Sequence, residues 1–198
     1  MSKITRDLFG VYKDKEIYRF TLINTKGNSV SLINYGGTVT SWIINTENGK
    51  AKNIVAGFDT LQEYPENTAT LGCIAGRYAN RIANGHFYIK GTTYVLACND
   101  GKNHLHGGEK GFDKKVWEAT IIEKEEPMVS LNYFSMDREE GYPGNLYVTA
   151  EFSYTDDDEL IIGYSAKTDK PTPVNLTSHC YFNLSGDMAS SILDHSLQ

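Results

Sequence analysis

The sequence predicts an all-β fold, a large antiparallel sandwich, and three observations carry this prediction. Apolar and polar residues alternate along several segments, which is the period of a half-buried strand. Only one short segment could form a helical turn. Aromatic residues and glycines are plentiful (13 Tyr, 8 Phe, 18 Gly), as is typical of β proteins with many turns. The 198 residues contain no linker and no repeat, so we expect one domain, 1–198, large enough to bury a core.

The first part of the chain predicts three strands. The segments "EIYRFTLIN" (16–24) and "SVSLINYGG" (29–37) flank "TKGN", which indicates a hairpin with a glycine in its loop. The segment "TVTSWIIN" (38–45) continues as a third strand. The two glycines before it predict a bulge or a tight bend.

Two further hairpins follow. The first is "GHFYIKGTTYVLA" (85–97), with its turn at Lys90 and Gly91. The second pairs residues 146–155 with residues 159–168 across "DDD". Alternation predicts the following inward residues in that second hairpin: Leu146, Val148, Ala150, Phe152, Tyr154, Leu160, Ile162, Tyr164 and Ala166. The segment "DTLQEYPEN" (59–67) could hold one helical turn, which its proline limits.

Charge and cysteine usage exclude several classes of partner. The net charge is −6 at pH 7, and without a basic patch we expect neither nucleic acid nor an anionic membrane surface as a partner. No apolar run approaches the length that spans a bilayer, and "MSKITRDLFG" has no apolar leader. The three cysteines, Cys73, Cys98 and Cys180, are odd in number and widely spaced, so the sequence predicts a cytoplasmic protein. Nothing in it indicates an oligomeric state.

The loop "NHLHGG" carries His104 and His106 two residues apart, on the same side of an extended backbone. They could bind a metal together with Glu109. Alternatively, one histidine contacts a polar ligand while its neighbour packs or faces solvent, or neither has a role. The residues alone leave these readings open.

The segment "GRYANRI" places Arg77 and Arg81 four residues apart. A guanidinium presents several donors in a fixed fork, which suits carboxylates or paired sugar hydroxyls. A surface salt bridge is the commoner fate of a single arginine. The residues alone do not show which of the two arginines would bind a ligand.

The segment "TPVNLTSHCYFNLSG" sets His179 in a strand-like run. Alternation puts His179, Tyr181 and Asn183 on one face, and Cys180 with Phe182 on the other. An aromatic ring beside polar donors can form the floor of a sugar site. An unperturbed imidazole, with a pKa of about 6.5, can give or take a proton near neutral pH. The alternative is a buried histidine that bonds to the backbone.

Four segments in this order resemble the aldose 1-epimerase (galactose mutarotase) family: "GRYANRI", "NHLHGGEKGFDKKVW", "EEGYPGNL" and "TPVNLTSHCYFNLSG". The resemblance implies a β-supersandwich fold. It also implies interconversion of the α and β anomers of an aldohexose such as galactose or glucose. Neither a metal nor an organic cofactor is expected, and the partner is the small sugar itself.

The resemblance assigns four residues to the sugar: Asn80, Arg81, His106 and His179. We expect Tyr181, on the same face as His179, to be a further contact. His179 matches the family's proton donor, which protonates the ring oxygen while a base takes the proton of the C1 hydroxyl. His106 and Arg81 would hold hydroxyls or stabilise charge that develops on oxygen. Arg77 and His104 receive no role.

The resemblance does not supply the base. In the family a glutamate performs this step, and that residue and a sugar-binding aspartate come from later in the chain. No acidic residue here matches either motif, so we expect this chain to be the N-terminal portion of a mutarotase. It would then lack the base, which lies beyond Gln198, and be inactive alone. If it were active, Glu139 and Glu140 would be the first candidates.

Three other readings remain open. The chain could be a non-catalytic carbohydrate-binding sandwich that keeps the sugar contacts. It could be a metal-dependent, cupin-like enzyme that uses His104 and His106. It could also act on a hexose 6-phosphate, but the sequence offers no obvious basic cluster for the phosphate.

Overall fold

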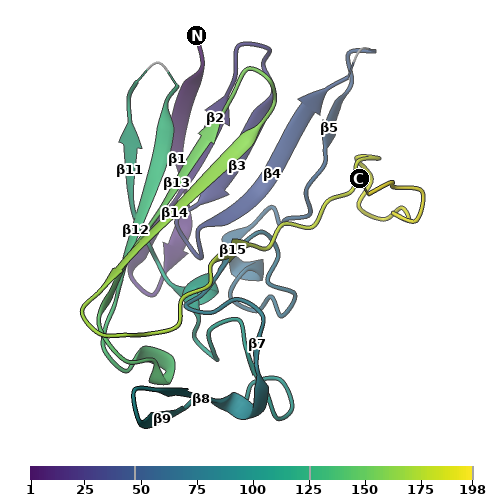
Figure 1. The fold of residues 1–198 in the computed structure, drawn as a ribbon. Helices are drawn as coiled ribbons and strands as arrows, with labels where there is room; N and C mark the ends of the chain where they lie inside the picture. The colour runs from purple at the N-terminus through teal and green to yellow at the C-terminus, as the bar shows by residue number, and fades with distance from the viewer. Residues whose placement is uncertain (47, 125, 198) are drawn as a thin grey trace.

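The chain folds into two large antiparallel sheets that face each other, with connecting loops and three two-stranded sheets gathered at one end (Figure 1). A computed structural model describes residues 1–46, 48–124 and 126–197. Within these ranges no helix has the length and apolar character needed to cross a membrane. The predicted all-β architecture is confirmed.

The first sheet has five strands in the order β1-β2-β3-β4-β5. Their bounds are β1 Lys3–Tyr12, β2 Lys15–Ile23, β3 Ser29–Ile33, β4 Thr38–Asn45 and β5 Ala51–Asn53. The predicted hairpin is present, with Ile23 of β2 opposite Ser29 of β3. The predicted bend is also present, because Gly36 and Gly37 adopt φ values of +67° and +56° before β4 begins.

The second sheet has four strands in the order β11-β12-β13-β14. Their bounds are β11 Glu118–Ile122, β12 Met128–Ser135, β13 Leu146–Tyr154 and β14 Leu160–Thr168. The five predicted inward residues of β13 are all buried, at 0–3% exposure. In β14, which is the edge of this sheet, Leu160, Ile162 and Tyr164 are only half-buried. The prediction was wrong for Ala166, which is exposed, because an edge strand has a neighbour on one side only.

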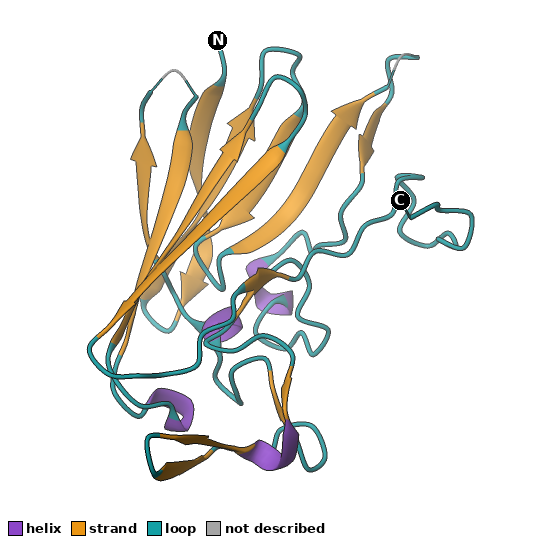
Figure 2. Cartoon of the chain, viewed as in Figure 1, coloured by secondary structure: helices purple, strands orange, loops and turns teal. Residues whose placement is uncertain are grey.

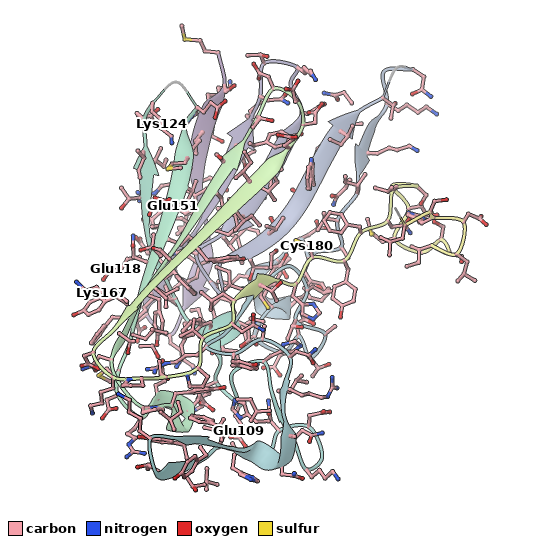
Figure 3. The ribbon with its side chains drawn as sticks, in the orientation of Figure 1. Glu109, Glu118, Lys124, Glu151, Lys167 and Cys180 are labelled. Atoms are coloured by element: carbon pink, nitrogen blue, oxygen red, sulfur yellow. The ribbon has the colours of Figure 1, made fainter. Side chains whose placement is uncertain are left out.

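The core lies between the two sheets. It joins apolar side chains of both layers: Phe20, Leu22, Val30, Leu32, Val39, Val129, Leu131, Leu146, Val148, Ala150 and Phe152. Glu151 of β13 and Lys167 of β14 lie at positions that alternate with the predicted inward ones (Figure 3). Removal of the apolar surface from water drives the sheets together.

Short strands and 3-10 turns lie within the connections between the two large sheets, separated by loops (Figure 2). The paired strands are β6 Ile74–Ala75 with β15 Thr177–Ser178, β7 Arg81–Ile82 with β10 His104–Leu105, and β8 His86–Ile89 with β9 Thr92–Val95. The short 3-10 turns are η1 Leu61–Glu63, η2 Ala83–Gly85, η3 Phe112–Lys114 and η4 Glu139–Gly141. The predicted β8–β9 hairpin and the helical turn at 59–67 are confirmed, the latter as η1.

The β13–β14 turn is tied to the first sheet through Asp158. One carboxylate oxygen accepts hydrogen bonds from Asn24 (2.7 Å), Asn28 (2.7 Å) and Tyr154 (2.8 Å). Lys26 approaches the other oxygen at 3.3 Å. Burial alone would raise the pKa of Asp158, but the bonds from Asn28, Tyr154, Asn24 and Lys26 outweigh it and lower the pKa to about 2.

Asp158→Asn is expected to lower the free energy of unfolding at pH 7 by about 1–3 kcal/mol, because the amide loses charged hydrogen bonds. A depressed pKa stabilises the fold above the unfolded-state value of about 3.9. This stabilisation is lost as the pH falls through about 2. Urea unfolding at pH 7 and pH 2.5 should therefore show a difference between wild type and variant that shrinks with acid. The exposed neighbour variant Asp157→Asn is the control, and equal effects of both variants would contradict the assignment.

Candidate active site

A hollow of about 570 Å³ opens among the connecting loops. Its lining comes from segments far apart in the sequence: residues 65–70, Asn99, residues 105–106 and 108–109, residues 113–114, and the pair His179 and Tyr181. The fold therefore brings together two of the segments that the sequence analysis singled out, "NHLHGG" and "SHCYFN". This volume lies in the range typical of small-ligand sites.

His179 is held by main-chain pairing that continues beyond β15. Its N–H donates to the carbonyl of Cys73 (2.8 Å), and its carbonyl accepts from Gly72 (2.9 Å). Because residues alternate along this extended segment, Cys180 packs against the core while Tyr181 lies with His179, at 5.2 Å between ring centroids. Figure 3 labels Cys180 on this segment. The predicted placement of His179 and Tyr181 on one side is confirmed.

The alternation fails at the next two residues. Asn183 is buried, and its amide donates to the carbonyls of Asp187 (2.8 Å) and Ser190 (3.0 Å), so it closes a turn of its own. Phe182, predicted on the same face as Cys180, is 47% exposed and has one edge against Trp42. Main-chain pairing continues here, since Phe182 is bridged to Val55 and Asn183 N–H donates to Ile54 O (2.9 Å), but the side chains no longer follow a period of two.

His106 reaches the hollow from a strained turn. Its φ is +52°, which is uncommon for a residue with a side chain. The main chain of Asn80 holds it twice, because His106 N–H donates to Asn80 O (3.1 Å) and Asn80 N–H donates to His106 Nδ1 (3.0 Å). Since Nδ1 accepts, the ring proton sits on Nε2. Burial, and then the nearby His179, lower the pKa of His106, so its ring is neutral at pH 7.

His106 and His179 form an edge-to-face pair with ring centroids 5.0 Å apart and planes at 90°. Tyr181, 44% exposed, extends the same wall. The result is a polar and aromatic surface that combines a fixed N–H donor with a second imidazole.

His104 has a structural position instead. It is fully buried, Nδ1 lies 2.7 Å from the carbonyl of Ala97, and Nε2 lies 2.7 Å from the hydroxyl of Tyr142. A carbonyl can only accept, so Nδ1 carries the proton and Nε2 accepts from Tyr142. Burial also lowers the pKa of His104, which keeps the ring neutral.

This arrangement does not support the metal reading, because both nitrogens of His104 are already bonded within the protein. Glu109 lines the hollow, but its neighbour His106 has Nδ1 committed to Asn80. Across the part of the chain that the structure describes, no three His, Cys, Asp or Glu side chains gather as metal ligands would.

The two arginines have different environments. Arg77 is 2% exposed, and its guanidinium donates to the side chain and carbonyl of Ser135 and to the carbonyls of Met136, Pro143 and Gly144. It is an internal anchor for the loop before β13. Sequence reasoning gave it no role.

Arg81 is half-exposed and forms a salt bridge with Asp100, with Nε 2.7 Å from Oδ2. It also donates to the side-chain oxygen of Asn80 (3.3 Å). Strand pairing sets Arg81 opposite Leu105, beside the turn of His106. Of the five predicted sugar contacts, three line the hollow and two, Asn80 and Arg81, lie next to it.

Three carboxylates also line the hollow, Glu66, Glu109 and Asp113, and sequence reasoning considered only Glu109, as a metal ligand. Figure 3 labels Glu109 in the loop region near β8. The side chain of Asp113 is paired with Lys114 (2.7 Å). No periodic pattern marks Glu66 or Asp113, since the first lies after η1 and the second within η3.

The two glutamates that sequence reasoning named as substitute bases are occupied elsewhere. The carboxylate of Glu139 accepts from Lys115, Tyr133 and Ser135. The carboxylate of Glu140 accepts the main-chain N–H groups of Glu109 and Lys110 at 3.0 and 3.1 Å. Both carboxylates therefore stabilise loops.

Comparison with known proteins decides the family. A sequence profile described as aldose 1-epimerase matches residues 18–198. The chain belongs to the aldose 1-epimerase family. The resemblance expected from the four motifs is thereby confirmed.

Individual relatives point to the same family. Aldose 1-epimerase of Escherichia coli (strain K12) is 40% identical over 93% of this chain and 53% of its own length. Galactose mutarotase of Sus scrofa is 38% identical over 100% of this chain and 57% of its own length. The crystal structure of galactose 1-epimerase from Lactobacillus acidophilus NCFM superposes with a TM-score of 0.84 at 30% identity, over 93% of this chain and 54% of that one. This epimerase-family chain thus spans about half the length of its curated relatives.

Proposed function

We propose that the hollow binds an aldohexose and that these residues supply the acid half of anomer interconversion. The observation that carries the proposal is the edge-to-face pair of His106 and His179 in one hollow with Tyr181. An exposed aromatic ring beside fixed hydrogen-bond donors is the usual surface for a pyranose, whose C–H faces pack on rings while its hydroxyls bond to polar groups.

In the proposed reaction a base takes the proton of the C1 hydroxyl while His179 protonates the ring oxygen. The C1–O5 bond breaks and the open-chain aldehyde forms. Rotation about C1–C2 and closure with the proton transfers reversed give the other anomer. Atoms and charges balance over the cycle, and no cofactor is needed.

His106 acts as a donor in this scheme. Its Nε2–H is fixed by the acceptor role of Nδ1, and its lowered pKa keeps it neutral beside His179. A neutral donor can bond to a sugar oxygen without competing for the proton that His179 transfers. We assign Arg81 and Asn80 to sugar hydroxyls at the rim, where a shift of the Arg81–Asp100 ion pair would free the guanidinium.

We assign the base to no residue of this chain. In the family a glutamate performs the step, and the proposal keeps a carboxylate in that role. The cytoplasm remains our proposed location, supported by three cysteines that are free thiols in the structure.

Polarimetry tests the proposal. A chimera would join residues 1–198 to the remaining part of the Escherichia coli relative, and freshly dissolved α-galactose would be the substrate. We expect faster approach to the equilibrium rotation than in buffer alone. A folded chimera that binds galactose without accelerating mutarotation would favour the non-catalytic carbohydrate-binding reading instead.

A further inference from the structure

The turn that presents His106 has an unusual backbone. His106, Gly107 and Gly108 adopt φ values of +52°, +88° and +109° in succession. Glycine tolerates such values, whereas a residue with a Cβ in this region is strained and persists only where its surroundings hold it. The hydrogen bond from Gly108 N–H to Leu105 O (3.0 Å) closes the turn, but it leaves the imidazole direction to other contacts.

The side chain of Asn99 brackets this turn on both sides of His106. Its Oδ1 accepts the N–H of Leu105 at 2.7 Å. Its Nδ2 donates to the carbonyls of Leu105 (2.9 Å) and Gly108 (3.1 Å). One planar amide therefore fixes the residue before His106 and the end of the turn after it.

The other restraint on His106 comes from the main chain of Asn80, which bonds to both its N–H and its Nδ1. The bond to Nδ1 forms only when the imidazole ring has one position and one orientation. The turn that Asn99 brackets sets both. Movement of the turn would break the Asn80–Nδ1 bond, and the ring would then be free to carry its proton on either nitrogen.

We propose that Asn99 is a positioning residue that holds the turn 105–108 so that His106 points its Nε2–H into the hollow. Asn99 itself lines the hollow, but its acceptor and its amino group are already bonded to the turn, so it acts through His106. The identity of the ligand that this N–H contacts rests on the proposed function. The geometry of the turn does not.

The test is the tautomer of His106 in the whole 198-residue chain, read from long-range ¹H–¹⁵N correlations of histidine-labelled protein. His106→Gln identifies the signals. In the wild type we expect one protonated nitrogen, Nε2, and one acceptor nitrogen, Nδ1. In Asn99→Ala the two nitrogen signals should move toward each other as both tautomers become populated. Asn99→Asp keeps an acceptor for Leu105 N–H and loses both donors, so we expect an intermediate shift.

Asn24→Ala is the matched control. Asn24 is a buried clamp of the same kind, whose oxygen accepts from the N–H groups of Lys26 and Asn28 and whose amino group donates to Thr155 O. Loss of the Asn24 side chain should lower the free energy of unfolding more than loss of the exposed Asn99 side chain does. It should leave the His106 signals unchanged. Unchanged signals in both Asn99 variants, or equal changes in Asn24→Ala, would overturn the proposal.

Galactose titration separates this inference from the function. If the His106 tautomer responds to Asn99 but galactose shifts no imidazole signal, the positioning role stands and the proposed function fails. If galactose binds the wild type and the two Asn99 variants equally while the tautomer stays fixed, the positioning role fails and the function stands. In the active chimera, loss of a positioning contact of this kind is expected to lower kcat/KM by about 10–100-fold.

Discussion

Arg77→Ala is expected to lower the free energy of unfolding by about 3–5 kcal/mol, since the change removes a buried cation and leaves its partners unpaired. The guanidinium donates to four residues between 135 and 144 at 2.8–3.2 Å. The carboxylate of Glu139, which shares Ser135 with Arg77, would lose a nearby positive charge. Urea unfolding followed by circular dichroism measures the effect.

Two variants calibrate that result. Arg81→Ala removes a half-exposed ion pair, and its cost should stay below about 1 kcal/mol. Arg77→Lys keeps the charge but not the planar fork, so it should fall between the two alanine variants. A cost for Arg77→Ala no greater than that for Arg81→Ala would show that the anchor is not needed.

His179→Ala should lower the rate of anomer interconversion by about 10²–10⁴, the usual contribution of a general acid. The change would be made in the chimera with the Escherichia coli relative and followed by polarimetry. His86→Ala is the matched control, because His86 is exposed in β8 and its ring forms a hydrogen bond with the nearby carbonyl of Asn84. A rate within a factor of about three of the wild type, at equal folding, would place the proton donor elsewhere.

The sequence allowed the fold class and several hairpins to be predicted because those strands bury one face. In β13, Leu146, Val148 and Ala150 alternate with polar residues, and the period of two is plain. Strand β1 was not predicted, since most of its residues are exposed and it contains a bulge between Leu8 and Gly10. Strands β11 and β12 were also missed. In β12 the buried residues Val129, Ser130 and Leu131 are consecutive, so this strand does not show a period of two.

The candidate site was only partly predictable. His106 and His179 were found through motif resemblance and Tyr181 through strand alternation, and the structure places all three at one hollow. The burial of Arg77 and the pairing of His104 with Tyr142 depend on contacts 58 and 38 residues away in sequence. No local pattern encodes such contacts.

Asn99 illustrates the same limit at shorter range. Its bonds reach only 6 and 9 residues along the chain, yet they depend on the left-handed turn at His106. A histidine followed by two glycines permits that conformation without specifying it. The sequence therefore permits the turn at this loop but does not identify the side chain that fixes it.

The most direct test of the account is galactose binding at the paired imidazoles of the 198-residue chain. Histidine-labelled protein would be titrated with galactose and, separately, with mannitol, which carries hydroxyls but no pyranose ring. We expect galactose to shift the signals of His106 and His179 to saturation, while His86 and His104 do not respond and mannitol has no effect. Equal shifts with mannitol, or no response of His106 and His179 to galactose, would contradict it.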